Sequence, residues 1–150
     1  ERLGYDYELC EIASGELEGF MRARDFDGIN VTMPYKAAII PYLDYIDDPA
    51  EKIGAVNTVI NRDGKLYGYN TDFYGMQALI DHAEIDPYGK KVAILGSGGT
   101  ARTARTLLES LGASEIITVS RSGPIDYDDL YSKHSDTRIN QMKDVVGTLV

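Results

Sequence analysis

The chain has 150 residues, 43% of them hydrophobic, which is enough to bury a core and, by length alone, to form one domain. Its formal net charge is −9, and its 15 Lys and Arg residues form no stripe, which argues against a nucleic-acid partner. One cysteine cannot form an internal disulfide, and no run is apolar enough for a membrane span or a secretory signal, so we expect a cytoplasmic protein.

The beginning of the chain predicts a strand, a helix and a second strand. The alternation of Tyr5–Ile12 is typical of a strand, in which Cys10 is expected to be a small core residue and not a nucleophile. A helix capped by Ser14 is expected next, because apolar residues recur at helical spacing after it. Asp27-Gly28 then turns the chain into the short strand Ile29–Thr32.

Prolines shape the prediction for the following segment. Pro34 suits the first turn of a helix, since its missing amide hydrogen has no partner there, and the helix is expected to reach about Tyr45. Pro41 lies inside that span and favours a break or a second short turn. Asp47-Asp48-Pro49 is typical of a loop.

A β-hairpin and a helix complete the first half. Ala55–Asn61 and Lys65–Asn70 are extended runs, and the Asp63-Gly64 pair between them is typical of tight hairpin turns. A helix capped by Thr71 or Asp72 is expected to follow.

A turn-forming stretch, Ile85–Gly89, precedes a predicted strand, helix and strand. The first strand, Val92–Leu95, leads into Gly96-Ser97-Gly98-Gly99-Thr100-Ala101, which has the pattern of a dinucleotide fingerprint. The backbone amides of such a loop can approach a pyrophosphate, although a glycine-rich turn also occurs where the chain needs only a tight bend. Helical spacing after the loop and a second strand, Ile116–Val119, favour nucleotide binding.

Ser120-Arg121-Ser122 ends the second strand, where this kind of fold contacts the ribose of its cofactor. Asp or Glu at this point holds the free 2′-hydroxyl of NAD, whereas a guanidinium can bind a 2′-phosphate through two hydrogen bonds. Arg121 therefore predicts NADP. The alternative is that Arg121 only ends a strand in solvent.

Three strings place polar groups at the ends of apolar strands: Gly28–Lys36, Gly54–Thr58 and Gly68–Asp72. Open α/β sheets bind their ligands at such strand ends. Each string also has an ordinary explanation, because an asparagine can form a turn, a lysine can be a solvated charge and an aspartate can cap a helix. Their combination ahead of a nucleotide fingerprint is more specific than any one of them.

Four motifs follow one another along the chain: N-V-T-x-P-x-K, G-A-V-N-T, N-T-D and G-x-G-G. In their order and spacing, the chain resembles the shikimate dehydrogenase family over roughly residues 5–122. Members of that family reduce 3-dehydroshikimate to shikimate with NADPH in aromatic amino-acid biosynthesis. The resemblance implies an α/β fold, with a substrate-binding module at residues 1–84 and part of a Rossmann-type NADP-binding module at residues 85–150.

The resemblance also implies roles for individual residues. The implied catalytic pair is Lys36 and Asp72, the implied substrate-binding residues are Thr32, Asn57 and Thr71, and the implied NADP-binding residues are Gly96, Ser97, Gly98, Gly99, Thr100, Ser120 and Arg121. The chemistry agrees, because hydride transfer to a ketone places negative charge on an oxygen that Lys36 can neutralise or protonate while Asp72 fixes its ammonium.

Relative to the family, the sequence lacks a first strand and a carboxylate-binding serine loop before Glu1, and further nucleotide-binding strands after Val150. The resemblance thus implies a chain truncated at both ends, with no role assigned to residues 123–150. Loss of a central strand would leave unpaired sheet edges open to self-association into a homo-oligomer.

Three functions remain open. The first is an NADP-dependent shikimate dehydrogenase, the second a quinate or aminoshikimate dehydrogenase, and the third a module that binds nucleotide or polyol without turnover. Lys36 and Asp72 together favour an enzyme, because a pure binder needs no proton donor. We expect no metal, since His82 and His134 lie far apart and without other ligands at suitable spacing.

Overall fold

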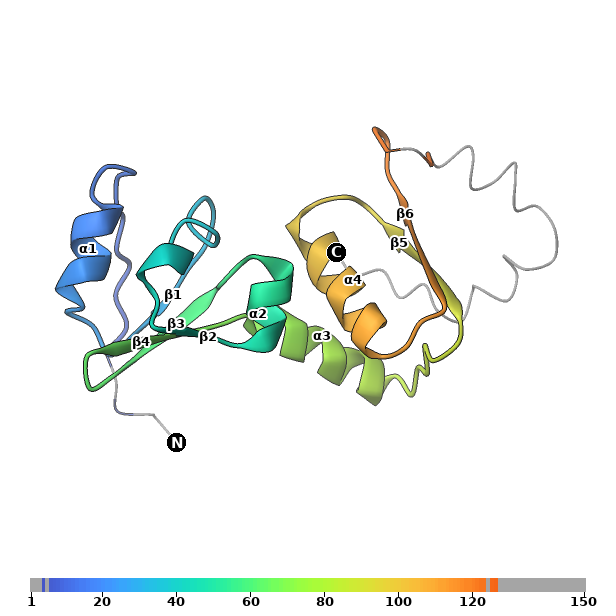
Figure 1. Cartoon of the computed structure of the whole chain (residues 1–150), viewed down its shortest axis with the longest axis horizontal. Coiled ribbons are helices and arrows are strands. Elements are labelled where there is room, and N and C mark those ends of the chain that lie inside the picture. Colours follow the sequence, from blue (N-terminus) through green and yellow to red (C-terminus); the bar gives the residue numbers. More distant parts are fainter. Residues whose placement is uncertain (1–3, 5, 124, 127–150) are drawn as a thin grey trace.

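The computed structural model describes residues 4, 6–123 and 125–126, which form two α/β lobes joined by a helix (Figure 1). The elements, in chain order, are α1 (Leu17–Ala23), β1 (Gly28–Asn30), a 3₁₀ helix (Ile40–Tyr42), β2 (Tyr45–Ile46), α2 (Asp48–Ile53), β3 (Thr58–Arg62), β4 (Lys65–Tyr69), α3 (Thr71–His82), β5 (Lys91–Leu95), α4 (Gly99–Ser110) and β6 (Glu115–Val119). The first lobe holds a four-stranded sheet in the order β1-β3-β4-β2, and the second holds the pair β5-β6. The predicted α/β class is confirmed.

The β3–β4 hairpin forms the centre of the first sheet, as predicted. Asp63 and Gly64 make its turn with φ angles of 52° and 78°, the two positive values that a type I′ turn requires. Since alternate side chains of a strand face opposite sides, Val59 and Leu66 point into the core, where both are fully buried. The hairpin therefore sets the register on which the rest of the first lobe is built.

Two apolar clusters form the core: one lies within the first lobe, and the other joins the two lobes. The cluster of the first lobe consists of Leu17, Met21, Ile39, Ala50, Val56, Val59 and Leu66. The second cluster draws on α2, α3, β5 and α4 and consists of Ile53, Ala55, Phe73, Met76, Val92, Ile94, Ala104, Leu107 and Leu108. Because the second cluster crosses from one lobe to the other, α3 and the end of α2 pack directly against α4 (Figure 1).

Gly68 of β4 lies beneath two side chains of the first lobe. A Cβ added there would meet Leu43 Cδ1 at 2.5 Å and the Val56 methyl groups at 3.1 and 3.2 Å. Gly68→Ala is therefore expected to lower the free energy of unfolding by about 1–3 kcal/mol, as measured by urea denaturation. Gly75→Ala is the control, because nothing lies within 4 Å of a Cβ added there on α3. It is expected to raise the free energy of unfolding by up to about 1 kcal/mol. Equal effects of the two substitutions would contradict the prediction.

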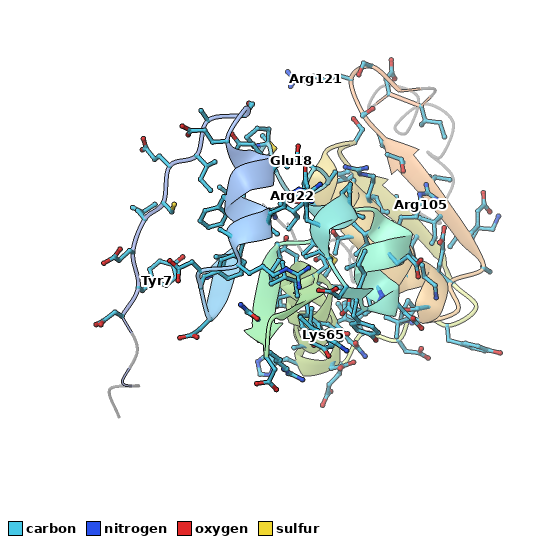
Figure 2. The ribbon with its side chains drawn as sticks, turned by 60° about the vertical axis from the view of Figure 1, so that its left-hand side comes forward. Tyr7, Glu18, Arg22, Lys65, Arg105 and Arg121 are labelled. Carbon is cyan, nitrogen blue, oxygen red and sulfur yellow. The ribbon has the colours of Figure 1, made fainter. Side chains whose placement is uncertain are left out.

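The predicted strand at the beginning of the chain is wrong over its described residues. Residues 6–12 are not in a strand, and Cys10 is exposed and not in the core. Two hydrogen bonds made by side chains of the lobe hold this segment: Asn30 Nδ2 donates to Tyr7 Oη at 3.3 Å, and Tyr35 Oη donates to the Ile12 carbonyl at 2.5 Å. Figure 2 shows Tyr7 on this extended segment. Alternation alone did not suffice, because a strand also needs a neighbour for its backbone groups.

The predicted cap and helix around the first prolines are also corrected. Ser14 does not cap α1: its N-cap is Glu16, whose side chain makes no capping hydrogen bond to the helix. No α-helix begins at Pro34; residues 33–39 form turns, and a 3₁₀ helix with Pro41 near its start succeeds them. The second short turn expected at Pro41 is thus present, and a proline at a helix start is the arrangement that its missing N–H favours.

The loop predicted at Asp47-Asp48-Pro49 is wrong, because these residues begin α2. The Asp47 carboxylate caps the helix by accepting from the Ala50 N–H at 3.0 Å, and a proline occupies the first turn. Asp followed closely by Pro is a helix-start signal as well as a loop signal. α2 is short and is followed by its C-cap Gly54, whose φ of 70° suits a glycine at that position.

The second lobe is the predicted strand, helix and strand. β5 and β6 pair in parallel, with Leu95 opposite Val119, and α4 connects them. Gly112 ends the helical segment with a φ of 76°. A parallel pair with a crossover helix is the unit on which nucleotide-binding folds are built.

Candidate active site

Lys36 and Asp72 meet although they lie on different elements. Lys36 belongs to the turns after β1 and Asp72 to the first turn of α3, and Lys36 Nζ lies 3.1 Å from Asp72 Oδ2. Their side chains are 32% and 52% exposed, so solutes can reach the pair. The Val56 N–H donates to the Lys36 carbonyl at 2.7 Å and fixes the backbone of the turn. An ion pair this exposed contributes at most about 1 kcal/mol to stability, so stability alone explains it poorly.

Asn57 lies at the junction of three elements beside this pair. Its backbone N–H donates to the Tyr69 carbonyl at 3.0 Å, and its carbonyl accepts from the Val31 N–H at 2.8 Å. Its side-chain Oδ1 accepts from the Thr71 N–H at 2.8 Å and from the hydroxyls of Thr71 and Thr58, each at 3.1 Å. Asn57 therefore ties three elements together: its backbone carbonyl holds the end of β1, and its side chain joins the start of β3 to the start of α3.

The first turn of α3 is positioned by Asn70, and the predicted cap, Thr71 or Asp72, is wrong. Asn70 is 2% exposed; its Oδ1 accepts from the Phe73 N–H at 3.3 Å and its Nδ2 donates to the Ala55 carbonyl at 2.9 Å. Asparagine before a helix is a common cap, so this signal was present in the sequence. Since Asn70 caps the helix, the Asp72 carboxylate is left to face Lys36.

A second contact on the same turn joins α3 to α2. The Tyr74 hydroxyl donates to Asp47 Oδ2 at 2.9 Å. This hydrogen bond to a carboxylate, together with burial, raises the pKa of Tyr74 above its ordinary value of 10.0. Asp47 thus holds two helices, because its other oxygen caps α2. Neither residue carries a recognisable motif, and sequence reasoning did not single them out.

Thr32 lies at the edge of this group. Its neighbour Val31 donates to the Asn57 carbonyl, and the Thr32 carbonyl accepts from the Tyr35 N–H at 2.9 Å. The Thr32 side chain is exposed. The structure therefore places Thr32 one residue from the backbone contact that leads to Asn57, on the turn that carries Lys36.

The glycine loop follows β5 and opens α4. Gly96 has a φ of 116°, which a residue with a side chain rarely adopts, and its N–H donates to the Val119 carbonyl at 2.8 Å. Gly98 is the N-cap of α4 and provides no side-chain cap. Nothing lies within 4 Å of a Cβ added at Gly96, Gly98 or Gly99. The first amides of α4 are thus approachable by an anionic group, as a pyrophosphate cradle requires.

Open space adjoins the same loop. A cavity of about 570 Å³ lies between α3 and the second lobe and is lined mostly by apolar side chains, among them Met76, Ile80 and Val92. Gly96 and Gly98 are part of its lining. The exposed residues Ser97–Thr100 therefore lie beside this cavity and solvent, and no other part of the described chain packs over them.

Ser120 and Arg121 follow β6 beside the glycine loop, because Gly96 and Ser120 succeed the paired residues Leu95 and Val119. Arg121 is exposed, and Figure 2 shows its side chain extending away from the ribbon at the tip of the turn. Ser120 is only 6% exposed, and a Cβ at Gly123 would meet its Oγ at 2.6 Å. The structure thus presents the guanidinium to solvent and encloses the hydroxyl.

The described part of the chain has neither a membrane-crossing helix nor a metal-ligand cluster. None of its helices combines the length and the apolar character that a membrane crossing needs. Among the same residues, no group of three or more His, Cys, Asp or Glu side chains could hold a metal ion. His82 ends α3, as expected, whereas His134 lies outside the described residues.

Comparison with known proteins gives a consistent result. Residues 1–59 match the model of the shikimate dehydrogenase substrate binding domain. The NADP(+) shikimate dehydrogenase of Halothermothrix orenii is 48% identical over 107 residues, which is 71% of this chain and 37% of that protein. A shikimate 5-dehydrogenase of Thermus thermophilus, solved with NADP(H) and shikimate, is 34% identical with a TM-score of 0.63, and the match covers 74% of this chain and 42% of that one.

A structural relative with a different name also matches. The ligand-free 5-ketofructose reductase of a Gluconobacter strain is 39% identical, with a TM-score of 0.67, and the match covers 75% of this chain and 42% of that one. The chain spans about two fifths of the length of the curated relatives that it matches. Over the residues that these matches cover, the chain belongs to the shikimate dehydrogenase family.

Proposed function

We propose that this chain carries the substrate site and the cofactor cradle of a cytoplasmic, NADP-dependent shikimate dehydrogenase, which interconverts 3-dehydroshikimate and shikimate. The observation that carries the proposal is the Lys36–Asp72 pair, whose Nζ and Oδ2 lie 3.1 Å apart beside the Asn57 cluster. We assign residues 1–84 to the substrate-binding module and residues 85–150 to the NADP-binding module. The two separate sheets and the family match to residues 1–59 support this division.

The residues of the first lobe provide the acid–base and binding chemistry. Lys36 holds a proton at the substrate oxygen that gains charge during reduction, and Asp72 keeps the ammonium in place through a charge-assisted hydrogen bond. Asn57, Thr71 and Thr32 supply amide and hydroxyl groups for the ring hydroxyls of the substrate. Such a site rejects analogues that lack a hydroxyl, because its own polar groups are then left unpaired.

The second lobe fits NADP. The open glycines and the uncapped start of α4 suit a pyrophosphate, and the exposed Arg121 suits a 2′-phosphate. When bound, NADPH supplies the hydride that reduces the ketone carbon. We assign Gly96–Thr100, Ser120 and Arg121 to this cofactor, with Ser120 acting through the shape of its turn because its side chain is enclosed.

The test is the formation of NADPH from shikimate and NADP, followed by its absorbance, with the oligomeric state recorded by light scattering in the same sample. We expect NADPH to form with shikimate in the enzyme that contains this chain, and we expect the 150-residue chain to self-associate, since β1 pairs only with β3 in the described sheet. Shikimate binding without NADPH formation would favour a module that binds without turnover. If the protein neither binds nor turns over shikimate and NADP, the proposal is contradicted.

A second candidate is an NADP-dependent reductase of another polyhydroxylated ketone. The match to 5-ketofructose reductase supports it, since that relative is 39% identical to this chain. The first-lobe residues bind hydroxyls and not the groups that distinguish shikimate from quinate, aminoshikimate or a keto sugar. Parallel assays with quinate, aminoshikimate and 5-ketofructose, at equal concentrations, separate these candidates by their kcat/KM values.

A further inference from the structure

Three hydrogen-bond donors converge on one oxygen at the centre of the first lobe. Asn57 Oδ1 accepts from the Thr71 N–H at 2.8 Å, from the Thr71 hydroxyl at 3.1 Å and from the Thr58 hydroxyl at 3.1 Å. An amide oxygen has two lone pairs, so its capacity to accept is used up by these three contacts. The arrangement leaves Oδ1 nothing to offer a ligand.

The same contacts determine which way the Asn57 amide faces. If the amide were flipped, Nδ2 would point its hydrogens at the Thr71 N–H, which cannot accept one. Within the described residues, Nδ2 makes no hydrogen bond, and no buried side-chain nitrogen lacks a partner. Nδ2 is therefore reachable from outside, as a donor, although the residue as a whole is only 8% exposed.

The hydroxyls of Thr58 and Thr71 acquire the opposite character. Each hydroxyl has one hydrogen, and both lie 3.1 Å from Asn57 Oδ1, closer than the 3.4 Å that separates them from each other; when both hydrogens are directed at Oδ1, neither hydroxyl donates to the other. The two hydroxyl oxygens lie 3.4 Å apart, so they form a pair whose remaining lone pairs can only accept. The cluster thus offers both a donor, Asn57 Nδ2, and acceptors, the two threonine hydroxyl oxygens.

We propose that Thr58 is a positioning residue for substrate binding: its hydroxyl holds the Asn57 amide so that Nδ2 donates to a ligand hydroxyl, while the threonine oxygens accept that hydroxyl's hydrogen. This inference rests on the proposed function, since it describes how the same site takes a polyol. It adds that the cluster requires a group that both donates and accepts. A hydroxyl meets this requirement, whereas an ether or ketone oxygen at the same place meets only half of it.

Four variants of the 150-residue chain test the proposal by isothermal titration with shikimate. Thr58→Val keeps the shape and removes the donor, and it is expected to weaken binding about three- to tenfold. Thr58→Ser keeps the hydroxyl and is expected to stay within about twofold of the unmodified chain. Thr106→Val makes the same chemical change on α4 and is expected to have no effect. Asn57→Asp keeps an oxygen for all three donors but loses the Nδ2 donor, and it is expected to weaken binding more than about tenfold.

A ligand-free measurement separates this inference from the proposed function. In NMR spectra of the ligand-free chain, the Nδ2 resonances of Asn57 are expected to shift in Thr58→Val, because the amide loses a hydrogen bond to its Oδ1. Thr58→Ser keeps that hydrogen bond, and its Asn57 resonances are expected to stay near those of the unmodified chain. If the unmodified chain binds no shikimate, the proposed function fails while the NMR result still decides the role of Thr58. If Thr58→Val matches Thr58→Ser in both the Asn57 resonances and shikimate binding, the inference is overturned.

Discussion

Lys36→Ala is expected to lower kcat about 10²–10⁴-fold in the enzyme that contains this chain, with a change in KM of less than about tenfold. Reduction of a ketone places charge on an oxygen that needs a cation or a proton in the transition state. In our proposal Lys36 supplies it from a fixed position, since its Nζ lies 3.1 Å from Asp72 Oδ2 and its carbonyl accepts from the Val56 N–H. The measurement is steady-state kinetics of shikimate oxidation with NADP.

Two variants make this result specific. Lys65→Ala removes an exposed lysine from the β3–β4 hairpin (Figure 2) and is expected to leave kcat unchanged. Asp72→Asn keeps the shape of the pair and removes its charge, and it is expected to lower kcat less than Lys36→Ala does, because the ammonium remains. Equal losses in kcat for Lys36→Ala and Lys65→Ala would contradict the role assigned to Lys36.

The same substitution is expected to change stability very little. The side chains of the Lys36–Asp72 pair are 32% and 52% exposed, and such pairs contribute about 0–1 kcal/mol. Urea denaturation of Lys36→Ala should therefore give a free energy of unfolding within about 1 kcal/mol of the unmodified chain. A large loss of stability would mean that reduced activity reflects unfolding and not chemistry.

The parts of the fold that were predictable from the sequence are those with local causes. The β3–β4 hairpin follows from Asp63-Gly64, whose positive φ angles are a property of the turn itself. The β5-α4-β6 unit follows from hydrophobic period and from the glycines between strand and helix. In both cases the residues that decide the structure are neighbours in the chain.

The errors have non-local or ambiguous causes. Residues 6–12 alternate like a strand, but a strand depends on a neighbouring strand that no local pattern reveals. Asp47 and Pro49 suit a loop and a helix start equally, and burial of Ala50 and Ile53 decides for the helix. The distinction was therefore made by tertiary packing.

The candidate site divides in the same way. Lys36, Asn57 and Asp72 stood out as polar residues at strand ends, and the structure brings the side chains of Lys36 and Asp72 together. Thr58 belonged to the string Gly54–Thr58 but received no role, because its proposed role comes from sharing one acceptor with Thr71, which lies 13 residues away in sequence. Side-chain hydrogen-bond partners of this kind cannot be inferred from spacing.

Arg121 determines the choice of cofactor in our proposal, and its removal has the second large effect. Arg121→Ala is expected to weaken NADPH binding about 10–100-fold and NADH binding less than about threefold, because a charged hydrogen bond to phosphate contributes about 1.5–3 kcal/mol. The guanidinium is exposed at the turn after β6, and that turn begins beside Gly96 of the cradle. Titration of both cofactors, followed by fluorescence of the reduced nicotinamide, measures the two affinities.

Arg102→Ala is the matched control, since Arg102 is an exposed arginine on the first turns of α4, close in sequence to the glycine loop. Both cofactors carry the pyrophosphate, and only NADPH carries the 2′-phosphate, so a general loss of positive charge should weaken the two equally. Selective loss of NADPH in Arg121→Ala but not in Arg102→Ala assigns the 2′-phosphate to Arg121. Equal loss of NADH and NADPH in Arg121→Ala would show that the arginine only adds charge near the pyrophosphate, and the argument for NADP would then rest on the relatives alone.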